Sequence, residues 1–213
     1  MIKAVFWDFG GVITSSPFES FNKFETENSL PQDFLRKVNS TNPDANAWAK
    51  LERNELDIHE FDKLFEKESR NLGFPVKGKD VLALLNGEVS PEMIQALKKI
   101  KGNLLQACLT NNIQSMDEEN FEGNVSASGK HDQVMQMFDF VFESSKENVR
   151  KPDPEFYLRA CERGKINPSE VVFLDDLGIN LKPARELGMK TIKVINSFEA
   201  LSQLNSYIEI ELD

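Results

Sequence analysis

Short apolar runs rich in β-forming residues alternate along most of the chain with longer segments in which apolar residues recur at helical spacing. The runs that predict strands are 4–7, 104–109, 138–143, 171–174 and 191–195. The segments that predict helices between them are 91–100, 156–163, 181–187 and 198–204. Strands that alternate with helices predict an α/β fold with a Rossmann-like, doubly wound parallel sheet. The final stretch, 207–212, alternates in polarity, which is typical of either an edge strand or a tail.

The pattern changes completely after the first strand. Phenylalanines recur there at helical spacing, beginning with Phe18, Phe21 and Phe24, and strand-forming runs are almost absent. Asp57, with Glu60 three residues later, predicts a capping box at the start of a helix over 58–72. We expect about four or five amphipathic helices in this part. They would form a separate helical cap domain, residues 16–86, inserted into an α/β core domain made of residues 1–15 and 87–213.

Composition limits the functions that this fold is expected to have. The chain has 213 residues and a formal net charge of −10, which argues against a nucleic-acid partner because a phosphate backbone requires a basic surface. No segment has the length and apolarity of a membrane span or a signal peptide, so we expect a cytoplasmic protein without a membrane partner. Cys108 and Cys161 lie in apolar surroundings and are expected to be reduced core residues. The oligomeric state stays open between a monomer and a homodimer.

Reactive side chains follow several of the predicted strands. Asp8 comes directly after the first strand, Thr110 after the second, and Asp175 and Asp176 after the fourth, while Lys151 lies in the loop before a helix. Because the carboxyl ends of parallel strands share one edge of a sheet, residues far apart in the sequence are expected to meet there. The polar segment 117–130 predicts a surface loop.

This set of side chains suits phosphoryl transfer through an aspartyl intermediate. A carboxylate such as Asp8 can act as a nucleophile and split one difficult step into two easier ones. Asp8 and Asp176 together offer the hard oxygen ligands that Mg²⁺ takes from proteins. The metal and Lys151 would neutralise the charge of a phosphate that approaches an otherwise acidic protein.

The remaining polar residues predict supporting roles. The Thr110 side chain and the backbone N–H groups of Asn111 and Asn112 would hold phosphate oxygens. Asn180 follows Asp176 by four residues, a spacing that would let its side chain orient Lys151 or a water in the outer metal shell.

Four motifs in this order resemble the haloacid dehalogenase (HAD) superfamily: WDFGGVITSSP, CLTNN, RKPDPEFY and VVFLDDLGINLKPARELGM. The final motif is most similar to that of the amino-terminal phosphatase-like domain of soluble epoxide hydrolases and of the related domain of some acyl-CoA dehydrogenases. The helical region occupies the position of the family's small cap domain. The resemblance implies Asp8 as nucleophile, Thr110 as phosphate ligand, Lys151 as charge stabiliser and Asp176 as metal ligand with Asp175 beside it.

Gly10 departs from the pattern of the family's phosphatases, which usually carry a general acid/base aspartate at this position. The family binds its metal through the backbone carbonyl here, so Gly10 is still expected to be a metal ligand, but the proton relay is missing. A cap residue such as Glu52, water, or a substrate with a good leaving group would have to compensate, or catalysis is slow. The acidic pair Asp175 and Asp176 favours a phosphatase over a dehalogenase, because the family's true dehalogenases lack that pair.

The prediction is therefore a Mg²⁺-dependent phosphatase that hydrolyses a small phosphorylated metabolite. One alternative is a catalytically weak or inactive protein that binds such a metabolite. Another is a hydrolase that acts at carbon, as dehalogenases do.

Overall fold

A computed structural model describes residues 1–85, 87–112, 131 and 133–212 of the chain. Its centre is a five-stranded sheet in the order β3-β2-β1-β4-β5, in which every neighbouring pair is parallel. The strands are β1 (Ala4–Trp7), β2 (Leu105–Thr110), β3 (Phe140–Glu143), β4 (Val171–Asp175) and β5 (Lys190–Lys193). This order confirms the predicted α/β class and makes β1, the first strand in the sequence, the central one.

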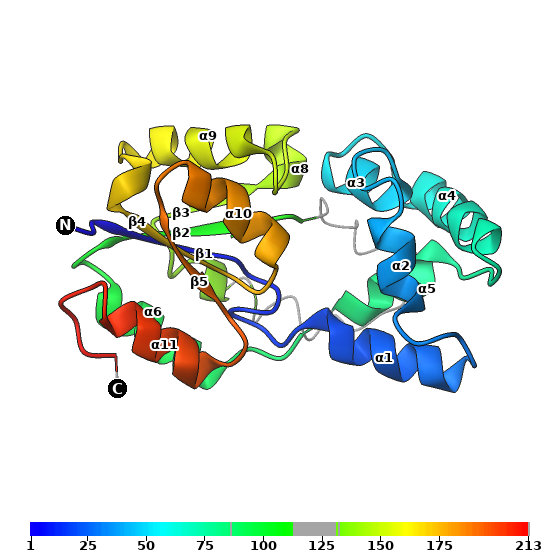
Figure 1. Cartoon of the computed structure of the whole chain (residues 1–213), viewed down its shortest axis with the longest axis horizontal. Helices are drawn as coiled ribbons and strands as arrows, with labels where there is room; N and C mark the ends of the chain where they lie inside the picture. The colour runs from blue at the N-terminus through cyan, green and yellow to red at the C-terminus, as the bar shows by residue number, and fades with distance from the viewer. Residues whose placement is uncertain (86, 113–130, 132, 213) are drawn as a thin grey trace.

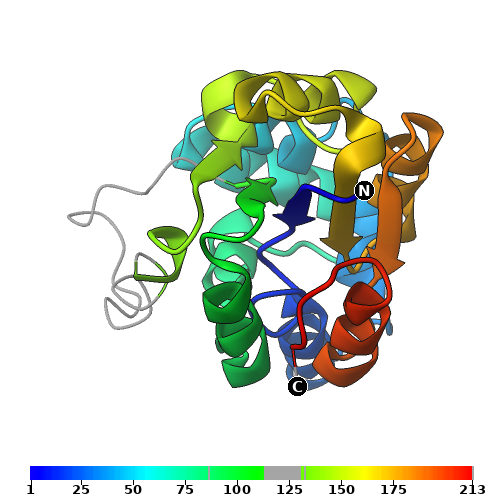
Figure 2. The ribbon, with the colours of Figure 1, turned by 90° about the vertical axis from the view of Figure 1, so that its left-hand side faces the viewer.

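Helices cover both faces of the sheet, so β1 is buried on both sides. Val5 and Trp7 face one apolar core, shared with α6 (Pro91–Ile100) and α11 (Ser197–Asn205). Ala4 and Phe6 face a second core, shared with α9 (Pro154–Gly164) and α10 (Gly178–Glu186). Figure 1 and Figure 2 show the two helix layers on opposite sides of the strands.

Residues 17–85 form a second group of helices with an apolar core of its own. That core includes Phe21, Leu35, Phe61 and Phe65. The helices are α1 (Pro17–Glu27), α2 (Phe34–Ser40), α3 (Ala47–Glu52), α4 (Ile58–Asn71) and α5 (Gly78–Leu82), followed by a 3₁₀ turn, η1 (Ala83–Leu85). They lie beyond one end of the sheet, on the right of Figure 1. We call these helices the cap.

Two linkers join the cap to the sheet and pair with each other. Thr14 and Val89 form an antiparallel bridge, and the Ser15 N–H donates to the Glu88 carbonyl at 2.8 Å. The division into residues 1–15, 16–86 and 87–213 stays a prediction, and its second boundary falls on residue 86, outside the described residues.

Local sequence signals explain where the helices begin. Ser90 accepts the Met93 N–H at 3.4 Å and Pro91 opens α6, as expected for a capped helix with proline at its first position. The predicted capping box of Asp57 and Glu60 is present at the start of α4. Asp153 caps α9 with its side chain, which accepts the Glu155 N–H at 2.9 Å.

One alternative left open by the sequence is decided, and one expectation about the sheet is wrong. Residues 207–212 form a tail and not an edge strand, and Ile208 and Leu212 pack into the core beside α6 and α11. The strand predicted over 138–143 begins only at Phe140, and the helix α8 (Ser144–Glu147), which the sequence analysis did not predict, follows it directly. The predicted loop 117–130 lies outside the described residues. In the part of the chain that the structure does describe, every helix is too short or too polar to cross a bilayer.

Candidate active site

Asp8 lies at the carboxyl end of β1, at the edge where the sequence predicts the reactive carboxylate. Its backbone N–H donates to the Leu174 carbonyl at 2.8 Å, and its Oδ1 accepts the Phe9 N–H at 2.7 Å. Burial raises the pKa of Asp8 well above its usual range, while the Lys151 ammonium lowers it and the Asp175 carboxylate raises it further. The negative charge of Asp8 therefore depends on nearby cations.

Lys151 supplies one such cation from the loop before α9. Its Nζ lies 2.8 Å from Asp8 Oδ1 and 2.8 Å from Asp175 Oδ2, and the side chain is only 1% exposed. Burial by itself would lower the pKa of Lys151, but the Asp175 and Asp8 carboxylates outweigh burial and raise it. We conclude that this lysine is protonated and joins two strand ends.

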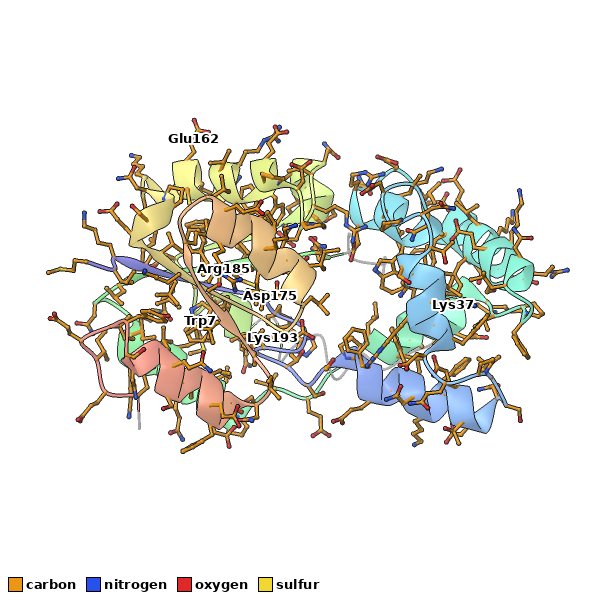
Figure 3. The ribbon with its side chains drawn as sticks, in the orientation of Figure 1. Trp7, Lys37, Glu162, Asp175, Arg185 and Lys193 are labelled. Atoms are coloured by element: carbon orange, nitrogen blue, oxygen red, sulfur yellow. The ribbon has the colours of Figure 1, made fainter. Side chains whose placement is uncertain are left out.

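Asp175 and Asp176 follow one another at the end of β4 but differ in their surroundings. Asp175 is fully buried, and its oxygens accept hydrogen bonds from Lys151, from the Leu177 N–H at 2.8 Å and from the Asn180 side-chain amide at 3.1 Å. Asp176 is half-buried. Burial and the neighbouring Asp175 raise the pKa of Asp176 to about 6. Figure 3 shows Asp175 at the end of the sheet that faces the cap, whereas Glu162 points outward from α9.

The three carboxylates suit a divalent cation. Asp8, Asp175 and Asp176 each offer an oxygen, and these oxygens lie within 4.8 Å of one another. With Lys151 as counter-charge, three carboxylates leave the cluster at a formal charge of about −2, which favours a hard cation such as Mg²⁺. Described donors engage both oxygens of Asp175 but only Oδ1 of Asp8, so we expect Asp8 and Asp176 to be the available ligands. The role of the Gly10 carbonyl stays a prediction.

Gly11 lets Asp176 approach the loop after β1. Its φ of +76° favours glycine, and a Cβ at this position would lie 2.4 Å from Asp176 Oδ2. At Gly10, by contrast, a Cβ would meet no atom within 4 Å. The first side-chain atom of the missing family aspartate would therefore meet no clash here.

The residues after β2 have unequal roles. Thr110 ends the strand with a buried side chain, and its phosphate-binding role stays a prediction. The Asn111 side chain pairs with the Lys151 backbone, accepting its N–H at 2.9 Å and donating to its carbonyl at 3.0 Å. The backbone N–H of Asn112 donates to Ser144 Oγ at 3.0 Å, so the expectation that it would hold phosphate is wrong. The Asn111 N–H remains a candidate for that role.

Asn180 has a different partner from the one predicted. Its side-chain amide donates to Asp175 rather than to Lys151, and it therefore orients the lysine only through that carboxylate. Tyr157, on α9, donates its hydroxyl to the Asn180 carbonyl at 2.7 Å. The sequence analysis missed Tyr157, because an aromatic residue at helical spacing in RKPDPEFY is typical of a helix core.

A contact between the cap and the sheet domain also escaped the sequence analysis. Glu52, at the end of α3, lies 2.8 Å from Arg150 Nε and accepts the Trp48 indole N–H at 3.0 Å. Burial raises the pKa of Glu52, with Arg150 acting in the opposite direction. No motif signalled this pair, because its two members belong to separate groups of helices.

Comparison with known families agrees with this geometry. The family described as haloacid dehalogenase-like hydrolase matches residues 2–188. The chain belongs to the haloacid dehalogenase-like hydrolase family. The resemblance inferred from the four motifs is thereby confirmed, and so is the prediction of a hydrolase.

Curated HAD-like relatives cover nearly the whole chain. Acyl-CoA dehydrogenase family member 10 of Mus musculus is 33% identical over 99% of this chain and 19% of that protein. Bifunctional epoxide hydrolase 2 of Sus scrofa is 28% identical over 99% of this chain and 40% of that protein. The chain thus spans about a fifth and two fifths of these two relatives. Sesquiterpene phosphatase astK of Aspergillus oryzae is 26% identical and matches 97% of this chain and 96% of its own length.

Solved HAD structures share the fold. A HAD-like family hydrolase from Porphyromonas gingivalis has a TM-score of 0.61 and 20% identity and covers 96% of this chain and 98% of its own. A HAD family enzyme from Bacteroides thetaiotaomicron, in complex with magnesium and inorganic phosphate, has a TM-score of 0.58 and 22% identity and covers 91% of this chain and 94% of its own. At these identities, the two structures support the fold alone.

Proposed function

We propose that the chain is a Mg²⁺-dependent phosphatase that hydrolyses a small phosphate monoester through an aspartyl-phosphate intermediate. The observation that carries this proposal is the cluster at the strand ends, where the Lys151 ammonium lies 2.8 Å from both Asp8 and Asp175. Asp176 completes the cluster with a carboxylate that is only half-buried. A nucleophilic carboxylate, a fixed cation and a candidate metal site thus share one edge of the sheet.

Each residue has a defined part in the proposed reaction. An oxygen of Asp8 attacks phosphorus, and the bond to the leaving oxygen breaks as the Asp8–phosphorus bond forms. Lys151 stabilises the negative charge on the phosphoryl oxygens from a fixed, buried position. Water then attacks phosphorus, which releases inorganic phosphate and restores the Asp8 carboxylate. Mg²⁺, held by Asp8, Asp176 and the Gly10 carbonyl, would supply neutralising charge at the phosphate oxygens.

Gly10 shapes the expected substrate preference. Without an aspartate at this position, the leaving oxygen departs without a proton from this residue, which favours leaving groups that are stable as anions. The cap would cover the site during the reaction and exclude bulk water.

One named relative supports the phosphatase. It is a sesquiterpene phosphatase that the chain matches over nearly its full length. We extend this chemistry to the present chain as part of the proposal. A small phosphorylated metabolite as substrate, a cytoplasmic location and a monomeric or homodimeric state remain predictions from the sequence.

The test is hydrolysis of an activated aryl phosphate by the purified protein with Mg²⁺. We expect turnover by the wild type and its loss in Asp8→Asn, which removes the nucleophile with little change in size. Asp57→Asn is the matched control, because asparagine also serves as a helix cap and Asp57 is exposed on the cap. Turnover that survives in Asp8→Asn would contradict the proposed mechanism.

The alternative that Gly10 favours is a phosphometabolite-binding protein without turnover. Binding of inorganic phosphate without hydrolysis of any member of a broad phosphate panel would support it. Hydrolysis of haloacids that persists in a chelator would instead support chemistry at carbon.

A further inference from the structure

A buried carboxylate of the cap contacts both segments that hold Lys151. Glu52 is the last residue of α3, and its side chain is 9% exposed. One carboxylate oxygen, Oε1, accepts the Trp48 indole N–H at 3.0 Å, and the other, Oε2, lies 2.8 Å from Arg150 Nε. The Asn111 amide also donates to Oε2 at 3.5 Å.

Both partners of Oε2 are connected to Lys151. Arg150 immediately precedes Lys151 in the chain. The Asn111 carboxamide pairs with the Lys151 peptide in both directions, at 2.9 Å and 3.0 Å. The backbone of Lys151 is therefore fixed by two residues that the cap carboxylate touches, while its ammonium binds Asp8 and Asp175.

These contacts do not suit Glu52 as a substitute for the acid missing at Gly10. A general acid must hold a proton and aim it at the leaving oxygen. Oε1 of Glu52 instead accepts from Trp48 and Oε2 accepts from Asn111, and Oε2 also forms an ion pair with the Arg150 guanidinium. This guanidinium lowers the pKa of Glu52 against the burial that raises it. The arrangement suits a fixed anion that orders its neighbours.

Because the Glu52 carboxylate is buried, the position of the cap and the position of the loop that carries Lys151 depend on each other. A carboxylate that is mostly withdrawn from water is costly unless a cation and hydrogen-bond donors satisfy it. Arg150 is the cation that meets Glu52, and it comes from the sheet domain. When α3 lies against the sheet domain, Glu52 therefore fixes Arg150, and with it the backbone that carries Lys151.

We propose that Glu52 is a positioning residue for Lys151, acting through Arg150 and Asn111, so that the lysine is fully ordered only while the cap lies against the sheet. This inference rests on the proposed phosphatase function. It deepens that function by coupling the seating of the cap to the assembly of the charged site.

The experiment is a double-mutant cycle on hydrolysis of an activated aryl phosphate, with Glu52→Gln, Arg150→Ala and the double variant. Each single change should lower kcat/KM by roughly 10- to 100-fold, the range typical of residues that orient a reacting group. The double variant should lose no more than the worse single variant, because both changes break one connection. Arg150→Lys, which keeps the charge, should recover part of the activity.

Glu55→Gln is the matched control. It breaks an ion pair of the same kind on the same part of the cap, in which Arg53 Nε lies 2.6 Å from Glu55 Oε1. The side-chain hydrogen bonds that the structure describes for Arg53 go to Glu55 and to the Asp44 carbonyl, both within the cap. We expect its kcat/KM to equal that of the wild type. The midpoint of thermal unfolding is measured for every variant. A midpoint well above the assay temperature shows that the variant is folded in the assay, so that a lower kcat/KM reports loss of positioning.

The outcomes distinguish the inference from the function on which it rests. Equal kcat/KM in Glu52→Gln and Glu55→Gln, or losses that multiply in the double variant, would overturn the positioning role and leave the phosphatase intact. A wild type that hydrolyses no phosphate would overturn the proposed function and this inference with it. If Glu52→Gln does not fold, the comparison of Arg150→Ala with Arg150→Lys decides, since Arg150 is partly exposed.

Discussion

At the residue scale, Gly10 is where this chain differs most from the phosphatases it resembles. A Cβ added at this glycine meets no atom within 4 Å, so a side chain can start at this position without a clash. The neighbouring Gly11 has no such freedom because Asp176 occupies the space. The two adjacent glycines thus differ in kind: one could be replaced, and the other is needed for the carboxylate cluster to form.

Gly10→Asp should accelerate hydrolysis of alkyl phosphates, whose leaving groups need a proton, by roughly 10²–10⁴-fold, the usual value of general acid–base help. Hydrolysis of an aryl phosphate with a good leaving group should change much less. Steady-state rates over a series of leaving groups check this. Gly10→Ala controls for the added bulk, and an equal gain in that variant would rule out a proton-transfer explanation.

The raised pKa of Asp176 leads to a prediction of how the stability of the protein depends on pH and on Mg²⁺. Burial and Asp175 raise its pKa from 3.8 to about 6 in the folded protein. Protonation of this carboxyl therefore favours folding, and its contribution is complete at pH below 3.8 and lost as the pH rises through about 6. The buried Asp8 shifts in the same direction.

In a chelator, the midpoint temperature of thermal unfolding should thus decrease as the pH is raised from about 5 to about 7.5. Mg²⁺ binds the ionised carboxylates and should restore the midpoint at the higher pH, with little effect at the lower one. Calorimetry at both values, with and without Mg²⁺, measures this. Ca²⁺ and Na⁺ at equal ionic strength serve as controls, and a metal effect that is independent of pH would contradict the assignment.

At the element scale, local signals explain how much of the fold could be predicted. The apolar run 4–7 ends at a charged residue, so β1 has the predicted bounds, and Ser90 with Pro91 marks the start of α6. The alternating stretch 207–212 left an edge strand and a tail both open, because burying Ile208 and Leu212 against helices satisfies the same pattern as a strand. Helix α8 is short and polar and carries no periodicity from which it could be predicted.

The candidate site also contains residues that the sequence could predict and contacts that it could not. Asp8, Lys151, Asp175 and Asp176 could be predicted to converge because the ends of parallel strands share one edge. Contacts between helices are set by packing that no local pattern reports. The hydrogen bond between Tyr157 on α9 and Asn180 on α10 is of this second kind.

Tyr157→Phe should lower the free energy of unfolding by about 1 kcal/mol, because it removes the buried hydrogen bond from the Tyr157 hydroxyl to the Asn180 carbonyl. Since Asn180 orients Asp175, and Asp175 holds Lys151, kcat/KM for an aryl phosphate should fall as well. Denaturant unfolding and steady-state kinetics measure the two effects. Tyr207→Phe, a change of the same kind far from the cluster, is the control; an equal loss of activity there would argue against transmission through Asn180.

At the scale of the whole molecule, the sheet domain with its two apolar cores and the cap with its own core are connected by two paired linkers. The bridge between Thr14 and Val89 and the bond from the Ser15 N–H to the Glu88 carbonyl join them. The linkers leave and re-enter the sheet domain next to β1, so the cap is attached beside Asp8. The position of the cap over the strand ends is therefore governed by how closely these linkers pair.

Gly87 lies where that pairing is tightest. A Cβ at this position would lie 2.6 Å from the Ser15 carbonyl oxygen and 2.9 Å from Thr14 Oγ1, both in the opposite linker. Gly87→Ala should push the linkers apart, so that α3 no longer seats Glu52 against Arg150, and kcat/KM should fall as in Glu52→Gln. The two helix layers of the sheet domain do not depend on the linkers, so the midpoint of thermal unfolding should change little while the activity falls. Glu88→Ala is the control, because the Glu88 side chain is exposed and its backbone bonds are kept. Full activity in Gly87→Ala would show that the linkers tolerate separation and that the cap is positioned by its own contacts with the sheet domain.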